Sequence, residues 1–482
     1  NSKFKIQNSK FKIQNSKFTV LKKIPDTLVI IFIVLVSFSL LTWIIPAGEF
    51  SRQMKNGREI VIPGSYHEVH ANPQTIADLL KAPVKGFNQS ALVVAFVLFV
   101  GGVFGVINKT GAIESGLKGL LNFTANKPYL KRAIIPIMVI IFAITGATFG
   151  LSEEVLVFIL ITIPLFISLG YDSILGVAVP LVGTAIGFGG AVTNPFTIGI
   201  AQGIAELPMF SGWEYRAFCL FVLTSVTVIY LDRYAQKISK NSALSPVFDL
   251  DKQRVDEYKD KEKEDFDTVK KIVLSLFALT IVLLIVGATA WDWYIYEISA
   301  LFLGLAISVA IVCRMGSQTL IDSFMSGAKE MLSASLVIAF SKGIIIIATE
   351  GKIIDTILYA ISHSIEDFPL LASAEIMFGV QSLINVIVPS GSGQAALTMP
   401  IMAPLCDIIG LTRQTGVLIF QMGDGLNNMI IPTSGVTMGT LAIARIPYDV
   451  WVKWLAPLMI IFVIVAMLLL IPPVVLFHFG PR

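Results

Sequence analysis

Long runs of apolar residues constrain the fold of this chain more than any other feature of its sequence. The first clear run, residues 28–45, contains no charged residue and ends at Pro46. About 20 mostly apolar residues are needed to cross the roughly 30 Å of hydrocarbon in a bilayer. Because backbone polar groups in lipid must be satisfied within the protein, such runs are expected to form helices. The sequence therefore predicts an all-α polytopic membrane protein.

Composition supports this interpretation. Of the 482 residues, 55% are hydrophobic and 14% are charged, whereas soluble domains average roughly 25% charged residues. This balance excludes a soluble enzyme, a disordered protein and a nucleic-acid binder, and it makes the lipid bilayer a partner. The net charge of +3 is too small to indicate a polyanionic partner.

The N-terminal segment sets the orientation. Residues 1–25 form a basic tail in which the sequence NSKFKIQ occurs twice in succession, and no acidic residue precedes Asp26. We exclude this repetitive tract from fold reasoning, but its lysines place the N-terminus in the cytoplasm by the positive-inside rule. Residues 47–89 are then expected outside, as a loop, and the run at 91–107 returns the chain to the cytoplasm.

Two interruptions in the first half predict unusual helices. The runs at 133–145 and 155–169 are short for spans and flank a Gly/Ser/Glu-rich segment, so residues 133–170 are expected to form a re-entrant hairpin. The segment 173–205 is too long for one ordinary helix and is interrupted at 187–195 by glycines and Pro195, which predicts a broken helix.

After the basic tail, the sequence divides into four expected regions. Residues 26–232 form a first transmembrane repeat, and 233–271 form a charged cytoplasmic linker whose side chains suit solvent. Residues 272–290 are expected to form one helix that reverses the orientation of the second half of the chain. Residues 291–482 form a second transmembrane repeat with a second hairpin at about 374–410 and a second broken helix.

The two halves are related by an internal repeat. Shifting residues 150–199 by 240 positions without a gap gives eleven identities, among them Ser152 with Ser392 and Thr193 with Thr433. Roughly three or four would be expected from composition alone. With four spans and a hairpin in each copy, and one unmatched helix between them, the copies are expected to be inverted. Inverted repeats with broken helices near the midplane are typical of secondary transporters.

Small and polar residues cluster at the two hairpins and the two breaks. Glycine allows the backbone to approach a ligand, and hydroxyl, amide and carboxylate groups replace lost water. Packing of transmembrane helices also uses small residues, but four clusters at repeat-related positions favour a substrate site. The predicted substrate-binding residues are Ser152, Glu153, Glu154, Thr193, Asn194, Ser390, Ser392, Gln394, Asp424, Asn427, Asn428, Thr433 and Ser434.

Charged residues at membrane depth are costly and therefore indicate function. Glu153, Glu154 and Asp424 suit Na⁺, H⁺ or a cationic amino or guanidinium group, whereas Lys342 could pair with a substrate carboxylate or with one of these acids. No adjacent nucleophile and base, metal-ligand spacing or phosphate-binding glycine loop is present. We therefore expect a transporter rather than an enzyme, without a cofactor, driven by an ion gradient such as Na⁺ or H⁺ or by a counter-substrate.

The segment 390–400 (SGSGQAALTMP), with the breaks TNPF at 193–196 and PTSG at 432–435, resembles the YfcC group of the C4-dicarboxylate anaerobic carrier (DcuC-like) family, within the ion transporter superfamily. The resemblance covers nearly everything from residue 25 onward. It implies a homodimer in the bacterial cytoplasmic (inner) membrane, with a static scaffold and a mobile elevator domain that carries both hairpins. Related sodium-coupled dicarboxylate carriers bear Ser-Asn-Thr at the hairpin tips, where this chain has Ser152-Glu153-Glu154 and Ser392-Gly393-Gln394.

The sequence supports three hypotheses. The first is an elevator-type carrier of amino acids, preferring cationic ones by arginine/ornithine-type exchange, with the three acids facing positive groups. The second is a C4-dicarboxylate carrier in which the acids bind coupling H⁺ or Na⁺ and Lys342 holds the substrate. The third is a channel, which would not need gated hairpins.

Overall fold

The structure is a computed structural model that describes residues 27–480 except 56–57, 63, 114, 117–127, 149, 260–266, 292, 294, 364–367 and 478. The basic tail of residues 1–25 lies outside the described residues. The principal helices of the first half are α1 (Thr27–Ile44), α2 (Ile76–Lys109), α4 (Pro128–Thr148), α5 (Val155–Ser168), α6 (Ser173–Gly189), η1 (Pro195–Gly199), α7 (Ile200–Ile204) and α8 (Trp213–Lys240). Short η2 (Ser242–Leu244) and α9 (Phe248–Lys259) follow.

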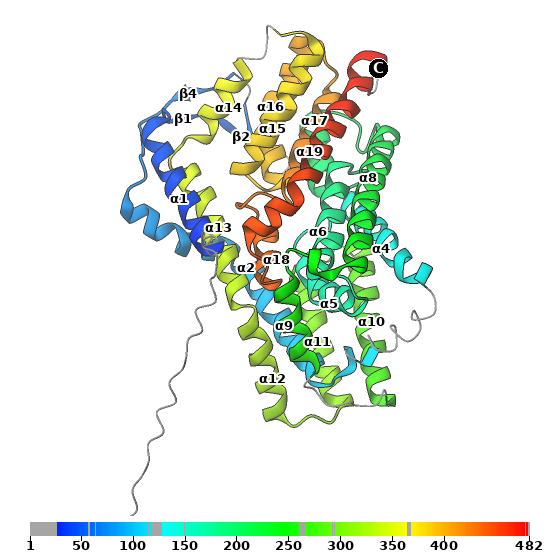
Figure 1. Cartoon of the computed structure of the whole chain (residues 1–482). Coiled ribbons are helices and arrows are strands. Elements are labelled where there is room, and N and C mark those ends of the chain that lie inside the picture. Colours follow the sequence, from blue (N-terminus) through cyan, green and yellow to red (C-terminus); the bar gives the residue numbers. More distant parts are fainter. Residues whose placement is uncertain are drawn as a thin grey trace, which may run out of the picture.

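The second half is also helical (Figure 1). Its elements are α10 (Thr268–Ala290), α11 (Ile295–Val312), α12 (Ser317–Glu330), α13 (Leu332–Glu350), α14 (Ile354–His363), α15 (Leu370–Ile387), α16 (Gly391–Ile409), α17 (Arg413–Asn427), α18 (Gly435–Ile443), α19 (Tyr448–Ile471) and η3 (Pro472–Leu476). Within the described residues, seven helices are long and apolar enough to cross a membrane. The predicted helical architecture is therefore confirmed, with helices suited in length and composition to span a membrane.

Two helices are longer than the sequence predicted. Helix α2 begins at Ile76 rather than near residue 91, so part of the expected outside loop is helical. A capping box explains this start, because the Thr75 hydroxyl accepts from the Asp78 backbone while the Asp78 carboxylate accepts from the Thr75 backbone. Helix α4 has 21 residues and continues through Pro136. The prediction of a short first arm at 133–145 was therefore wrong.

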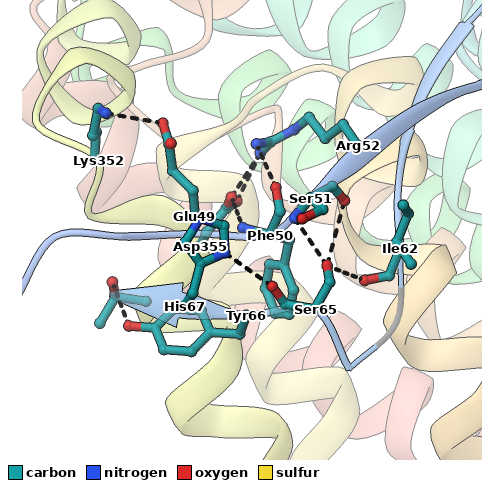
Figure 2. Close-up of polar contacts among 11 residues, drawn as sticks. Glu49, Phe50, Ser51, Arg52, Ile62, Ser65, Tyr66, His67, Lys352 and Asp355 are labelled. Atoms are coloured by element: carbon teal, nitrogen blue, oxygen red, sulfur yellow. Dashed lines mark hydrogen bonds and ion pairs between the residues drawn. The ribbon is translucent and has the colours of Figure 1, made fainter. Parts of the chain in front are cut away.

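Four short strands correct the expectation of an all-α chain. Strands β1 (Gly48–Glu49) and β4 (His67–Glu68) pair antiparallel, as do β2 (Arg52–Lys55) and β3 (Arg58–Val61). Figure 2 shows how this segment is held to α14 by Asp355, which accepts hydrogen bonds from the Phe50 backbone at 2.9 Å and from Arg52 Nη2 at 2.7 Å. The Tyr66 ring stacks on Tyr359 at a centroid distance of 4.1 Å. We call residues 48–68 the β cap.

The helices pack as two groups. The first group consists of α1, α2 and α10–α13, in which α2 packs on α11, α12 and α13, and α1 packs on α13. The second group consists of α4–α8, α15–α17 and α19. In it, α4 and α5 both pack on α6, while α15 and α16 both pack on α17, and α6 contacts α17. Helix α18 lies between the groups and contacts α13 and α5.

The charged linker does not lie wholly in solvent as predicted. Asp251 and Arg254 of α9 are each 8% exposed. Asp251 Oδ2 accepts from the backbone of Ser173, the first residue of α6, at 2.7 Å, and Arg254 donates to the carbonyl of Ala444 after α18. Burial raises the pKa of the Asp251 carboxyl. The linker helix thus fastens α6 to α18.

Candidate functional site

A cavity of about 300 Å³ lies where the interrupted helices meet, within the range of roughly 300–1,000 Å³ found for small-molecule sites. Its wall comes from the first tip (residues 150–154, between α4 and α5), the second tip (388–390, between α15 and α16) and the break between α17 and α18 (428–434). Residues of helices α2 and α13 complete the wall. The predicted site residues that line it are Ser152, Glu153, Ser390, Ser392, Asn428, Thr433 and Ser434.

Helix ends give the cavity a mixed electrostatic character. The N-termini of α5, α16 and α18 lie at its wall, together with the C-terminal end of α17. N-terminal backbone N–H groups favour anions, and C-terminal carbonyls favour cations. The backbone alone therefore offers positions for both charges of a zwitterion.

Unpartnered polar atoms point to a ligand in this cavity. Four of its lining residues have a buried side-chain oxygen with no hydrogen-bond partner among the described residues: Thr184, Thr197, Asn428 and Thr433. Buried polar groups are normally hydrogen-bonded, so such a cluster calls for a partner. A bound small molecule or water would supply one.

The two neighbouring glutamates of the first tip have different surroundings. Glu153 lines the cavity. Glu154 is 7% exposed, and its Oε2 accepts a hydrogen bond from the Ser152 backbone at 3.0 Å. Glu154 is thus engaged within its own tip and does not line the cavity, so of the two predicted acids the geometry assigns only Glu153 direct access to a ligand.

At the first break, residues 190–194, the predicted site residues are structural. Asn194 is fully buried; its Nδ2 donates to the Gly146 carbonyl at 2.9 Å and its Oδ1 accepts from the Phe196 backbone at 2.9 Å. Thr193 is exposed and bonds the Thr148 carbonyl at 3.4 Å. Both residues join the break to the end of α4, and neither lines the cavity. Thr197, three residues further on, lines it instead.

Asp424 lies directly behind the cavity wall. It is 1% exposed, and its Oδ1 accepts from Asn385 Nδ2 at 2.9 Å. A methyl group on Gly391 would come within 2.9 Å of Asp424 Oδ2 and 2.4 Å of Thr197 Cγ2. Gly391 itself lines the cavity, so the missing side chain at this position leaves only its backbone between the cavity and the carboxylate.

Two other predicted residues form hydrogen bonds within the helix framework of α15, α16 and α17. Gln394 is fully buried, donates from Nε2 to Gln381 Oε1 at 2.7 Å and accepts from Asn385 Nδ2 at 3.0 Å. Asn427 donates to the Gly423 carbonyl one turn earlier at 2.7 Å. Neither lines the cavity.

Lys342 faces the cavity from α13. It is half-buried and forms no hydrogen bond or ion pair with another described residue, although the charge of Glu153 acts on it. Lys342 and Glu153 are the only charged residues among those that the structure places around this cavity.

Sequence reasoning missed the residue that holds the first break open. Arg216 of α8 is fully buried and donates to the carbonyls of Ala191 and Val192 within the break and to those of Phe210 and Ser211. Its signal was a lone cation at the start of an apolar helix. Asn385, the partner of Asp424, was also missed, although an amide inside the apolar α15 could have indicated it. No group of three or more potential metal ligands gathers among the described residues.

Comparison with protein families gives one match over most of the chain. Residues 24–475 match the family described as "C4-dicarboxylate anaerobic carrier", DcuC. The chain is 35% identical over 468 residues to the Escherichia coli protein named "Putative basic amino acid antiporter YfcC", covering 89% of this chain and 92% of that one. It is 28% identical over 503 residues to a Haemophilus influenzae protein, covering 94% of this chain and 97% of that one. The family and the named relative are transporters rather than enzymes.

Two solved transporter structures resemble the chain only distantly. The Neisseria gonorrhoeae antimetabolite efflux pump MtrF has a TM-score of 0.41 at 17% identity, with 96% of this chain and 98% of that chain covered. The Alcanivorax borkumensis transporter YdaH has a TM-score of 0.41 at 14% identity, with 95% and 100% covered. At this level of similarity the two structures carry no argument about the site.

Proposed function

The chain belongs to the C4-dicarboxylate anaerobic carrier family of membrane transporters, and from this premise we propose that it is a secondary active transporter of amino acids. The preferred substrates are cationic, and the reaction is an exchange of the arginine/ornithine type across the bacterial cytoplasmic membrane. The observation that carries the proposal is the cavity of about 300 Å³ in which Glu153 is the one lining carboxylate, with Asp424 behind Gly391. The name of the Escherichia coli relative supports the same substrate class.

Charge balance favours a cationic amino acid. Such a molecule carries two positive groups and one carboxylate. Glu153 in the cavity wall and Asp424 behind Gly391 suit the former, and Lys342 with the helix N-termini suits the latter. The orphan oxygens of Thr197, Asn428 and Thr433 can accept hydrogen bonds from ammonium or guanidinium groups.

We propose an elevator mechanism in which the second helix group carries the substrate and the first remains static. Both tips and both breaks belong to the second group or to α18, whereas the residues that complete the wall belong to α2 and α13. The pairs α4/α5 and α15/α16 would be re-entrant hairpins of two inverted repeats, residues 26–232 and 291–482, joined by the linker 233–271 and the reversing helix 272–290. The N-terminus would face the cytoplasm, and the static group would form the contact of a homodimer.

A coupling ion is part of this proposal. If transport is not a pure exchange, Na⁺ or H⁺ would bind near Asp424, where the oxygens of Asn385 and Thr197 lack partners. Burial of a carboxylate beside unsatisfied oxygens is costly unless a cation or proton joins it. No other cofactor is proposed.

One observation favours a second function, ion-coupled C4-dicarboxylate transport. Lys342 and three helix N-termini face the cavity, and both attract carboxylates. The description of the family names the same substrates. In that case the acids would bind the coupling ion.

The test is uptake by the purified chain in proteoliposomes. Radiolabelled arginine is offered to vesicles preloaded with ornithine, buffer or succinate, and labelled succinate is offered in parallel. We expect arginine entry that depends on internal ornithine and falls sharply in Glu153→Gln. Entry of succinate without arginine would replace the proposal by the dicarboxylate function, and current without saturation would indicate a channel.

A further inference from the structure

The cavity holds two opposite charges that come from different helix groups. Glu153 is carried by the first tip, between α4 and α5, and Lys342 projects from α13. Helices α4 and α5 pack on α6 in the second group, whereas α13 packs on α2 and α1 in the first. The two charges therefore come from different helix groups and line one cavity.

Lys342 has surroundings that demand an anion. Its α13 neighbours in the cavity wall, Ile338 and Ile345, are apolar. The adjacent Ser341 is fully buried, and its hydroxyl donates to the Pro432 carbonyl at 3.5 Å. An ammonium group held in such a wall without a close ion pair is unfavourable, since charges in the interior are normally paired.

An internal ion pair with Glu153 would be the simplest partner, but the geometry does not provide it. The charge of Glu153 acts on Lys342, but the two described side chains form no hydrogen bond and no ion pair with each other. Both line the same cavity. A ligand with an ammonium group at one end and a carboxylate at the other would satisfy both residues at once.

We infer that Lys342 binds the carboxylate of the transported molecule, and that Glu153 binds its ammonium group. The inference rests on the proposed function in that the substrate occupies this cavity. The role of Lys342 applies to any amino acid or dicarboxylate, whereas the role of Glu153 requires a substrate with an ammonium group. A charge-assisted hydrogen bond to an ammonium group is stronger than a neutral one. Lys342 is thus a specificity residue for carboxylates.

The position of Lys342 adds a consequence for transport. Because it belongs to the static group of the proposed elevator, it contacts the substrate only while the carrying group lies against α13 as it does here. The carboxylate contact is then lost when the carrying group moves, whereas the Glu153 contact travels with the substrate. Loss of Lys342 should therefore change the affinity on one side of the membrane more than on the other.

The experiment compares arginine with agmatine, which is arginine without its carboxylate. Initial uptake is measured in proteoliposomes for the wild type, Lys342→Gln, Lys342→Arg and the control Lys329→Gln, which changes an exposed lysine of α12 outside the cavity. We expect Lys342→Gln to raise the KM for arginine by about ten-fold or more, as for loss of a charged partner, and to leave agmatine unchanged or improved. Lys342→Arg should restore part of the preference, and Lys329→Gln should match the wild type.

The outcomes separate the inference from the proposed function. Equal changes in KM for arginine and agmatine, or no change for either, would overturn the role of Lys342. A purely structural role would lower kcat or the amount of folded protein without altering the ratio of the two KM values. If the wild type carries succinate but not arginine, the proposed function fails, and the inference is then judged by whether Lys342→Gln raises the KM for succinate.

Discussion

Asp424 of α17 accepts a hydrogen bond of 2.9 Å from the side chain of Asn385 in α15. The same Nδ2 group of Asn385 also donates to Gln394 at 3.0 Å. The buried carboxylate behind the cavity wall is therefore oriented by the amide of Asn385, which is itself held by the amide of Gln394 in α16. This relationship predicts that the charge of Asp424 can be removed without loss of the fold.

Asp424→Asn should abolish most transport while the protein stays folded. The new amide oxygen can still accept from Asn385, but the negative charge behind Gly391 is lost. We expect initial uptake to fall by about ten-fold or more, equivalent to about 1.4 kcal/mol of barrier. Asp407→Asn, which changes an exposed partner of Arg413, is the matched control. Uptake by Asp424→Asn within two-fold of the control, at equal amounts of folded protein, would remove this acid from the site.

Gly391→Ala should impair transport by filling the space between the cavity and Asp424. The added methyl would lie 2.4 Å from Thr197 Cγ2 and 2.9 Å from Asp424 Oδ2, so atoms of the wall must shift. Gly379→Ala is the matched control in the paired helix α15, since nothing lies within 4 Å of its added methyl. Uptake and size-exclusion profiles of both variants provide the comparison, and equal uptake would show that this space is not used.

Arg216→Ala should destabilise the first break. The guanidinium donates to four carbonyls, and loss of one hydrogen bond to a charged group costs about 1.5–3 kcal/mol. The melting temperature in detergent should fall by several degrees. The variant Arg216→Lys should keep little of this stability, because an ammonium group cannot match the fork of donors on a guanidinium group. Arg233→Ala, at an exposed position of the same helix, should melt like the wild type; an unchanged melting temperature for Arg216→Ala would contradict the assigned role.

Asp355→Ala should release the β cap. Asp355 is 4% exposed and binds both the Phe50 backbone and Arg52 (Figure 2). We expect trypsin to cleave faster at the basic residues of β2 and β3 in this variant, because the segment opens more often. Glu49→Ala removes the more exposed ion pair with Lys352, at 3.4 Å, and should change cleavage little. Equal cleavage rates in the two variants would argue against an anchoring role for Asp355.

Much of the architecture follows from local sequence patterns. The apolar runs become helices because lipid offers the backbone no other partners. Helix α6 ends at Gly189, within the interruption predicted at 187–195, and α17 ends at Asn427 before the second break. The start of α2 was missed, although its Thr75–Asp78 capping box is a local sequence pattern.

The sequence predicted only some of the residues that line the cavity. The clusters identified the right segments, and about half of the predicted residues line the cavity. Asn194 and Gln394 are residues of types common in binding sites, yet their side-chain amides are hydrogen-bonded to other parts of the helix framework. Sequence alone does not say which neighbour takes a given amide, because such partners lie far apart in the chain.

The sequence by itself determined the helical membrane fold and its interruptions, because these depend on short stretches of apolar, glycine and proline residues. It also shows the internal repeat directly, as identities at a fixed shift. Only the tertiary structure decided that Glu153 lines the cavity while Glu154 accepts from the Ser152 backbone, and that Lys342 lines the same cavity from α13. It also decided that Arg216 and Asp251 are buried. The reason is physical: the side chain's role depends on which distant carbonyls, amides and helix ends packing brings within hydrogen-bond reach.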